Sequence, residues 1–119
     1  MHLIILKCKL HMARVTDAKL DYHGSLTIDE SLMQQAGLLP YEKILVANVD
    51  NGERFETYAI PGNAGSGEIG LNGAAARKGK IGDRLIIFSF ALMTPAEAAV
   101  AKPVILCLDE RNRIAERVH

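Results

Sequence analysis

Tyr22-His23-Gly24-Ser25, followed at once by Leu26-Thr27-Ile28-Asp29-Glu30, is the stretch around which the rest of the chain is organised. A glycine–serine pair between two apolar runs is most often a plain turn. Here the pair interrupts a strand-like run over 20–28, and a glycine inside a strand marks a bulge, a bend or a close backbone approach. Whether Gly24-Ser25 is a plain turn or a special backbone position therefore depends on the neighbouring residues.

A helix signal follows directly. Thr27 with Glu30 three residues later fits a capping box, and Gly37 stands where a C-terminal cap belongs. Ser25 is therefore predicted to lie between a strand and a capped helix, which is a more rigid setting than a loose surface turn.

Composition limits the class of protein. With 119 residues the chain is expected to form one domain, 1–119, and its 14 acidic side chains balance its 14 lysines and arginines. This balance disfavours a nucleic-acid binder and a membrane-surface patch. The apolar start, Met1 to Leu6, is too short for a signal peptide or a membrane span, so a cytoplasmic protein is expected.

The two cysteines, Cys8 and Cys107, are expected to be separate thiols in that compartment rather than a disulfide. Cys8, His11 and His23 match no standard zinc spacing, so no metal site is expected.

The run 3–17 alternates as a half-buried strand does, with Lys7, Lys9 and His11 in one row that could face an anion. A turn is predicted over 17–20. Downstream, Asp50-Asn51-Gly52 joins strands 43–49 and 53–60 as a hairpin. Alternation on its second strand puts Arg54 and Tyr58 on one face and Thr57 on the other.

After a loop and a short strand over 68–71, Asn72-Gly73 opens into Ala74-Ala75-Ala76-Arg77. Small residues after a glycine either let backbone amides point at a ligand or let a short helix pack closely on a neighbour, and both interpretations stay open. Strands over 84–92 and 104–109, a Thr94–Glu97 capping box and a polar tail over 114–119 complete the chain. Many short strands with two short helices predict a small β-barrel with the helices as caps.

Reactive chemistry at Gly24–Ser25 would make an electrophile from the chain itself. The Ser25 hydroxyl could attack the Gly24 carbonyl in an N-to-O acyl shift, with Thr57 and Asn72 as suitable polar neighbours. Elimination and loss of ammonia would then leave a pyruvoyl group at residue 25. Such a carbonyl serves amino-acid decarboxylation as pyridoxal does. Arg54 and Lys9 could hold carboxylates, and Tyr58 could supply a proton.

Five motifs in order resemble the aspartate 1-decarboxylase family: K-L-H, V-T-D-A-x-L-x-Y-x-G-S-x-T-I-D, N-G-E-R-F-x-T-Y-x-I, N-G-A-A-A-R and I-G-D. The resemblance implies a double-psi β-barrel and a homotetramer with sites between subunits. It also implies decarboxylation of L-aspartate to β-alanine for pantothenate synthesis, with cleavage into 1–24 and 25–119. The implied cofactor is a pyruvoyl group, with no metal and no pyridoxal phosphate, and a maturation factor is a possible partner.

The same resemblance assigns roles by position. It makes Ser25 the pyruvoyl precursor and the Schiff-base carbon, and Tyr58 the proton donor. The residues implied to bind substrate are Lys9, Arg54, Thr57, Gly73, Ala74 and Ala75, and those implied to support the site or its processing are Gly24, Tyr22, His11 and Asn72.

Three features complicate this assignment. Met12 stands where family members often have arginine, and Ala47 stands where some have a bulky aromatic, which affects the expected pocket shape or processing rate. Alternation also separates Thr57 from Arg54 and Tyr58, so either a bulge or a role in a neighbouring subunit's site is required.

Two other functions are compatible with the residues. An N-terminal-nucleophile hydrolase also cuts before a serine but keeps its amine. A non-catalytic small barrel could act as a binding module, for which the balanced charge gives no support.

Overall fold

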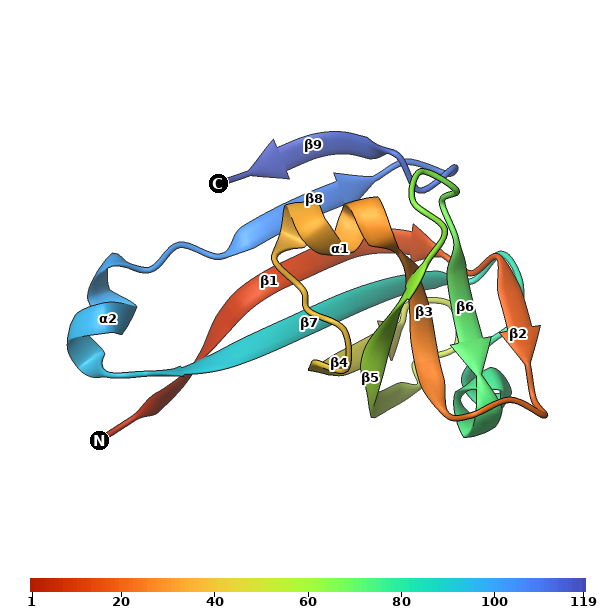
Figure 1. Cartoon of the computed structure of the whole chain (residues 1–119), viewed down its shortest axis with the longest axis horizontal. Helices are drawn as coiled ribbons and strands as arrows, with labels where there is room; N and C mark the ends of the chain where they lie inside the picture. Colours follow the sequence, from red (N-terminus) through yellow and green to blue (C-terminus); the bar gives the residue numbers. More distant parts are fainter.

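A computed structural model describes all of residues 1–119 and shows a mainly β chain built on one nine-stranded sheet. The strand order is β2-β6-β3-β5-β4-β7-β1-β8-β9 (Figure 1). The strands are β1 (Leu3–Arg14), β2 (Asp17–Lys19), β3 (Ser25–Asp29), β4 (Lys43–Asn48), β5 (Arg54–Gly62), β6 (Ile69–Asn72), β7 (Arg84–Met93), β8 (Val104–Leu108) and β9 (Ile114–Val118).

Three short helices accompany the sheet: α1 (Glu30–Ala36), α2 (Pro95–Val100) and the 3-10 helix η1 (Gly73–Lys78). No helix has the length and apolar character needed to cross a membrane. The predicted class, a mainly β barrel-like fold with short helices, is confirmed.

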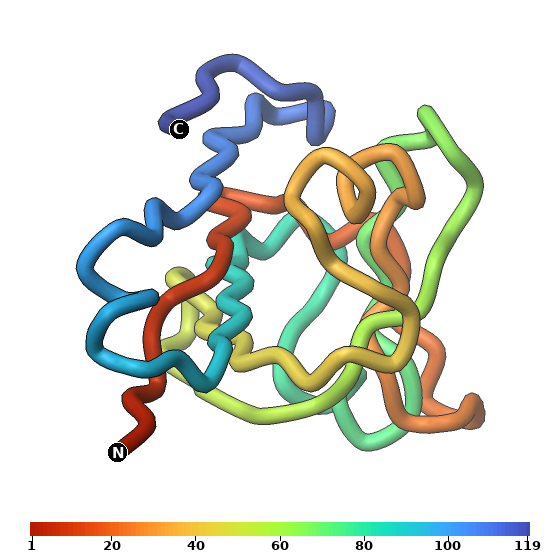
Figure 2. Tube along the Cα trace, turned by 60° about the vertical axis from the view of Figure 1, so that its left-hand side comes forward, coloured from red at the N-terminus to blue at the C-terminus, as the bar shows by residue number.

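The sheet curls around a single apolar core. Three of its strand pairs are parallel, namely β1 with β8, β2 with β6 and β3 with β5, which a simple up-and-down meander would lack. Figure 2 shows the two halves side by side, with β1, β7 and β8 in one and β2, β3 and β6 in the other. Fully buried side chains from both halves meet between them, among them Leu10, Leu26, Val46, Ile69 and Leu85.

One end of the molecule projects as an arm, made of the start of β1, the end of β7 and α2 (Figure 1). It carries apolar side chains that the chain itself leaves uncovered, because Ile4, Leu92 and Val100 are each at least 70% exposed. An apolar surface of this kind is typical of protein–protein contact.

Strand β1 follows the predicted alternation only in its middle. Its pairing with β7 shifts register between Leu6 and Cys8 and again between His11 and Ala13. Each bulge changes the phase of the side chains, so Ala13 rather than Met12 enters the core, and Lys7 leaves the row of Lys9 and His11. The predicted row of three basic side chains is therefore a row of two.

The cap of α1 also differs from the prediction. The helix begins at Glu30 with Asp29 as its N-cap, whereas Thr27 belongs to β3. The Asp29 carboxylate is buried and accepts hydrogen bonds from the backbone N–H groups of Ser31, Gly65 and Gly67 at 2.8–2.9 Å. Burial opposes its charge, but these bonds outweigh that effect and lower the pKa of Asp29. A cap that also binds a distant loop cannot be recognised from local spacing.

Three other segments were predicted wrongly. The expected turn over 17–20 contains β2, which pairs with β6, and the strand expected from Leu20 begins only at Ser25. The polar tail is β9, paired with β8. Each depends on a partner strand far away in sequence. The Gly37 left-handed cap and the Thr94–Glu97 capping box are confirmed.

The cysteines are unpaired, as expected. Burial raises the pKa of the Cys8 thiol to about 11, so Cys8 is a neutral core side chain.

Candidate active site

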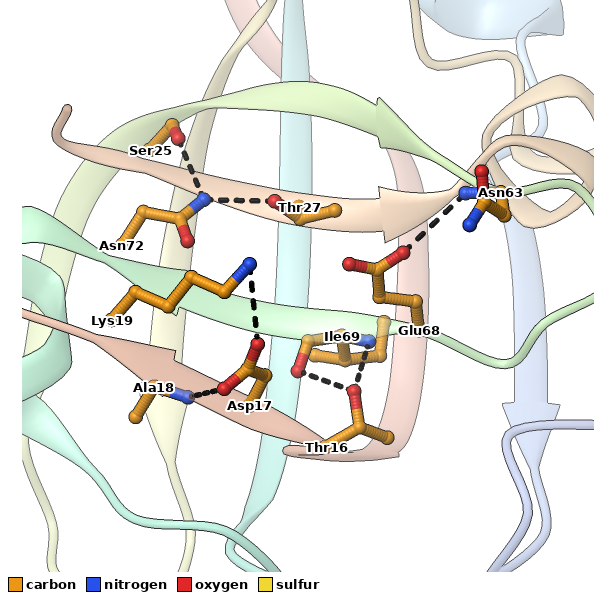
Figure 3. Close-up of polar contacts among 10 residues, drawn as sticks. All are labelled: Thr16, Asp17, Ala18, Lys19, Ser25, Thr27, Asn63, Glu68, Ile69 and Asn72. Atoms are coloured by element: carbon orange, nitrogen blue, oxygen red, sulfur yellow. Dashed lines mark hydrogen bonds and ion pairs between the residues drawn. The ribbon is translucent and has the colours of Figure 1, made fainter. Parts of the chain in front are cut away.

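Ser25 lies at the first position of β3, almost completely buried and paired with Asn72 on β6. The Asn72 amide nitrogen donates to the Ser25 hydroxyl oxygen at 2.9 Å and to the Thr27 hydroxyl oxygen at 2.8 Å (Figure 3). Ser25 in turn donates to the His23 carbonyl across a long 3.5 Å contact. The oxygen of Ser25 is therefore held by a strong donor while its proton is only weakly engaged.

Gly73 brings η1 into direct contact with the segment before Ser25. Its φ is +63°, and a Cβ placed on it would come 2.7 Å from the Tyr22 carbonyl oxygen and 2.8 Å from the Gly24 Cα. These are backbone atoms, and moving them aside would cost more free energy than rotating a flexible side chain. Of the two interpretations left open for this segment, the structure shows the closely packed short helix.

Substitution of Gly73 tests this contact. We expect Gly73→Ala to destabilise the fold by about 2 kcal/mol or more and to slow any cleavage at residue 24, because it combines backbone clashes with a left-handed φ. Gly82→Ala is the matched control, since Gly82 has a φ of +94° with open space around it. Thermal melting and electrophoresis measure both effects, and a Gly73→Ala protein with the behaviour of Gly82→Ala would contradict the contact.

Thr57 on β5 lies near the contact between Gly73 and the Gly24 backbone. A cavity of about 180 Å³ is lined in part by Gly24, Thr57, Ala74 and Ala75. Four residues predicted for one site are thus brought together by β5, η1 and the turn before β3.

Tyr58 faces the other side of β5, as alternation predicted. Strands β3 and β5 pair in parallel with Leu26 opposite Ala59, and both side chains are fully buried in the core. Ser25 and Tyr58 each precede one of these residues by one position. They therefore lie beside each other and point to the face of the sheet opposite Leu26 and Ala59. The β4–β5 pairing shows no register shift, so no bulge brings Thr57 to the Tyr58 side.

Arg54 and His11 lie farther round the outer surface of the same sheet. Ala47 pairs with Arg54 on β5 and with Ile86 on β7, and Ile86 pairs with His11 on β1.

Burial and the neighbouring Lys9 charge lower the pKa of His11. Its Nδ1 is buried without a hydrogen-bond partner in the chain. An unpaired buried polar atom is uncommon and calls for a partner from elsewhere.

Lys9 is well separated from Ser25. Its ammonium lies 5.9 Å from the centre of the Phe88 ring, on the outer surface of β1. Between β1 and β3 stand β7, β4 and β5, so Lys9 and Ser25 are four strand spacings apart, about 19 Å along the curved sheet. The two residues therefore lie on strands that are not neighbours in the sheet.

Thr27 was missed as a site residue because it was interpreted as a helix cap. The signal that could have identified it is the two-residue spacing from Ser25, which puts both hydroxyls on one face of a strand.

Comparison with known proteins gives consistent matches. A model of the family described as aspartate decarboxylase matches residues 1–115. Aspartate 1-decarboxylase of Coprothermobacter proteolyticus is 55% identical over 116 residues, covering 98% of this chain and 95% of that protein. The enzyme of the same name from Shouchella clausii is 54% identical, covering 98% and 91%. That from Lactiplantibacillus plantarum is 52% identical, covering 96% and 88%.

Proposed function

This chain belongs to the aspartate decarboxylase family, and from that premise we propose that it converts L-aspartate to β-alanine and CO2 with a pyruvoyl group made from its own Ser25. The observation that carries the proposal is the bond from the Asn72 amide to the Ser25 hydroxyl, directly after Gly24. Supply of β-alanine for pantothenate synthesis is the metabolic role that goes with this reaction.

The proposed maturation cuts the chain into 1–24 and 25–119. The Ser25 oxygen attacks the Gly24 carbonyl carbon, and the peptide C–N bond breaks to give an ester and a free amine. Loss of the Ser25 α-proton and of the Gly24 carboxylate then leaves dehydroalanine, and one water molecule replaces its nitrogen, which leaves as ammonia. The products are a glycine carboxylate and a terminal pyruvoyl group.

The surroundings of Ser25 suit this chemistry. The Asn72 amide fixes the attacking oxygen, and Gly73 holds the backbone of Gly24 in close contact. Thr57, which lines the cavity beside Gly24, is the candidate to stabilise negative charge on the Gly24 oxygen.

In the mature enzyme the pyruvoyl carbonyl would condense with the substrate amine and draw electrons from the carbon that loses its carboxylate. Lys9 and Arg54 supply the positive charge that holds the substrate carboxylates, and Arg54 can form a bidentate pair of hydrogen bonds with one of them. Tyr58, beside residue 25 on the adjacent strand, supplies the proton that replaces the carboxylate. Thr57 with Gly73, Ala74 and Ala75 lines the other side.

We further propose that each site forms between two subunits of a homotetramer. Lys9 and Ser25 lie on strands that three other strands separate, and Lys9 contacts Phe88 rather than the Ser25 site of its own chain. A second subunit that covers the outer surface would bring its own Lys9 to the Ser25 of the first. The unpaired Nδ1 of His11 and the exposed apolar arm support such contacts.

Turnover of L-aspartate tests the proposed function. The purified, cleaved protein is expected to release β-alanine and CO2 without added pyridoxal phosphate, and to lose activity when treated with phenylhydrazine, which blocks carbonyl groups. L-glutamate, one methylene longer, measures specificity in the same assay. A cleaved protein that releases no β-alanine would contradict the proposal.

A further inference from the structure

Tyr58 has a second neighbour besides residue 25. The ring of Tyr41 lies against it, with the ring centres 6.2 Å apart and the planes tilted by 40°. This separation is within the range of favourable aromatic pairs. Because Tyr41 is 77% exposed, its ring contributes little to the core and much to the immediate surroundings of Tyr58.

Tyr41 is held in a strained backbone conformation. Its φ is +70°, a region that bulky side chains rarely adopt. Two backbone hydrogen bonds fix it to the residue after Tyr58: the Tyr41 N–H donates to the Ala59 carbonyl at 2.7 Å, and the Ala59 N–H donates to the Glu42 carbonyl at 3.0 Å. Strain that the surroundings enforce is typical of functional positions.

The side chain of Glu42 anchors this turn to the rest of the sheet. Its carboxylate accepts hydrogen bonds from the Lys7 ammonium at 2.8 Å, from the Leu39 N–H at 3.1 Å and from the Ser89 hydroxyl. Lys7 is available because the bulge in β1 takes it out of the row of Lys9. Burial opposes the charge of Glu42, but the bonds from Lys7 and Ser89 outweigh it and lower its pKa.

We propose that Glu42 and Tyr41 are positioning residues that set the orientation of Tyr58 for proton donation. Glu42 locks the turn over 39–42 against β1 and β7, and the turn holds the Tyr41 ring against Tyr58. This inference rests on the proposed role of Tyr58. In this proposal Tyr41, which is strained and largely exposed, serves catalysis rather than the packing of the core.

Glycine at residue 41 separates a positioning role from a structural one. Tyr41→Gly relieves the strained φ and removes the ring, so we expect an unchanged or higher melting temperature, complete cleavage, and a kcat reduced about ten- to a hundredfold with KM within about twofold. Tyr41→Phe keeps the ring and is expected to retain kcat.

Glu42→Gln removes the charge that anchors the turn, and it should lower kcat in the same way. Glu97→Gln is its control, because the Glu97 carboxylate also accepts a backbone hydrogen bond, from the Thr94 N–H, and also has a lowered pKa, but Glu97 belongs to α2, away from Tyr58. Full kcat in Tyr41→Gly, with cleavage confirmed by mass, would overturn the positioning role while leaving the proposed function intact. A cleaved wild-type protein without aspartate turnover would overturn both.

Discussion

Replacement of Ser25 by alanine is expected to leave one uncut chain of 119 residues with no measurable aspartate turnover. The substitution removes the attacking oxygen, so neither the ester nor the dehydroalanine that leads to the pyruvoyl group can form, and the loss should reach the scale of the whole catalytic acceleration, roughly 10⁶-fold or more. Ser25 is a small buried residue, so alanine fits its place and the fold should persist. Electrophoresis under denaturing conditions and a β-alanine assay measure the two effects.

The chain contains its own control for this experiment. Gly65-Ser66 is a second glycine–serine bond, but Ser66 is exposed and donates to the Asn63 carbonyl at 2.6 Å, with no side-chain amide on its oxygen. We expect this bond to stay intact and Ser66→Ala to behave as wild type. Cleavage or turnover that survives in Ser25→Ala would contradict the proposed cofactor.

Mixed subunits are expected to recover activity that neither parent has. Lys9→Ala alone should lose most turnover while still being cleaved, and Ser25→Ala alone should be inactive. If each site combines Ser25 of one chain with Lys9 of another, co-expression of the two variants rebuilds intact sites. Random assortment makes about one quarter of the sites wild type in composition.

The measurement is the specific activity of the purified mixed oligomer. The control is an oligomer of Ser25→Ala with the double variant Ser25→Ala/Lys9→Ala, which cannot recover activity because none of its chains has Ser25. An oligomer that contains both single variants and has no activity above the Lys9→Ala parent would contradict a site shared between subunits.

The elements that local chemistry determines could be predicted from the sequence. The Asn51-Gly52 hairpin, the left-handed cap at Gly37 and the capping box at Thr94 each depend on neighbours within a few residues. The separation of Thr57 from Tyr58 was also predicted, because alternation along a strand needs only the strand itself.

Features that depend on distant partners could not be predicted in this way. Asp29 caps α1 while binding Gly65 and Gly67, and nothing in the nearby sequence indicates that loop. The bulge that sends Lys7 to Glu42 appears only in the pairing of β1 with β7.

For the candidate site, the motif set supplied the candidate residues, whereas their distribution over two faces of the sheet required the fold. Ser25 and Asn72 could be suspected from composition, but their contact depends on the antiparallel pairing of β3 with β6. The separation of Lys9 from Ser25 depends on the order of five strands. That order cannot be deduced from spacing along the chain.

The intact mass of the purified protein under denaturing conditions, fresh and after warm incubation, shows directly whether Ser25 becomes a pyruvoyl group. We expect two fragments, one ending at Gly24 and the other lighter by one ammonia than a chain that starts with serine. A second fragment that keeps the serine amine would instead indicate hydrolase chemistry. A chain that stays uncut alone and after incubation in cell extract, where any maturation factor is present, would contradict the proposal that Ser25 becomes the cofactor.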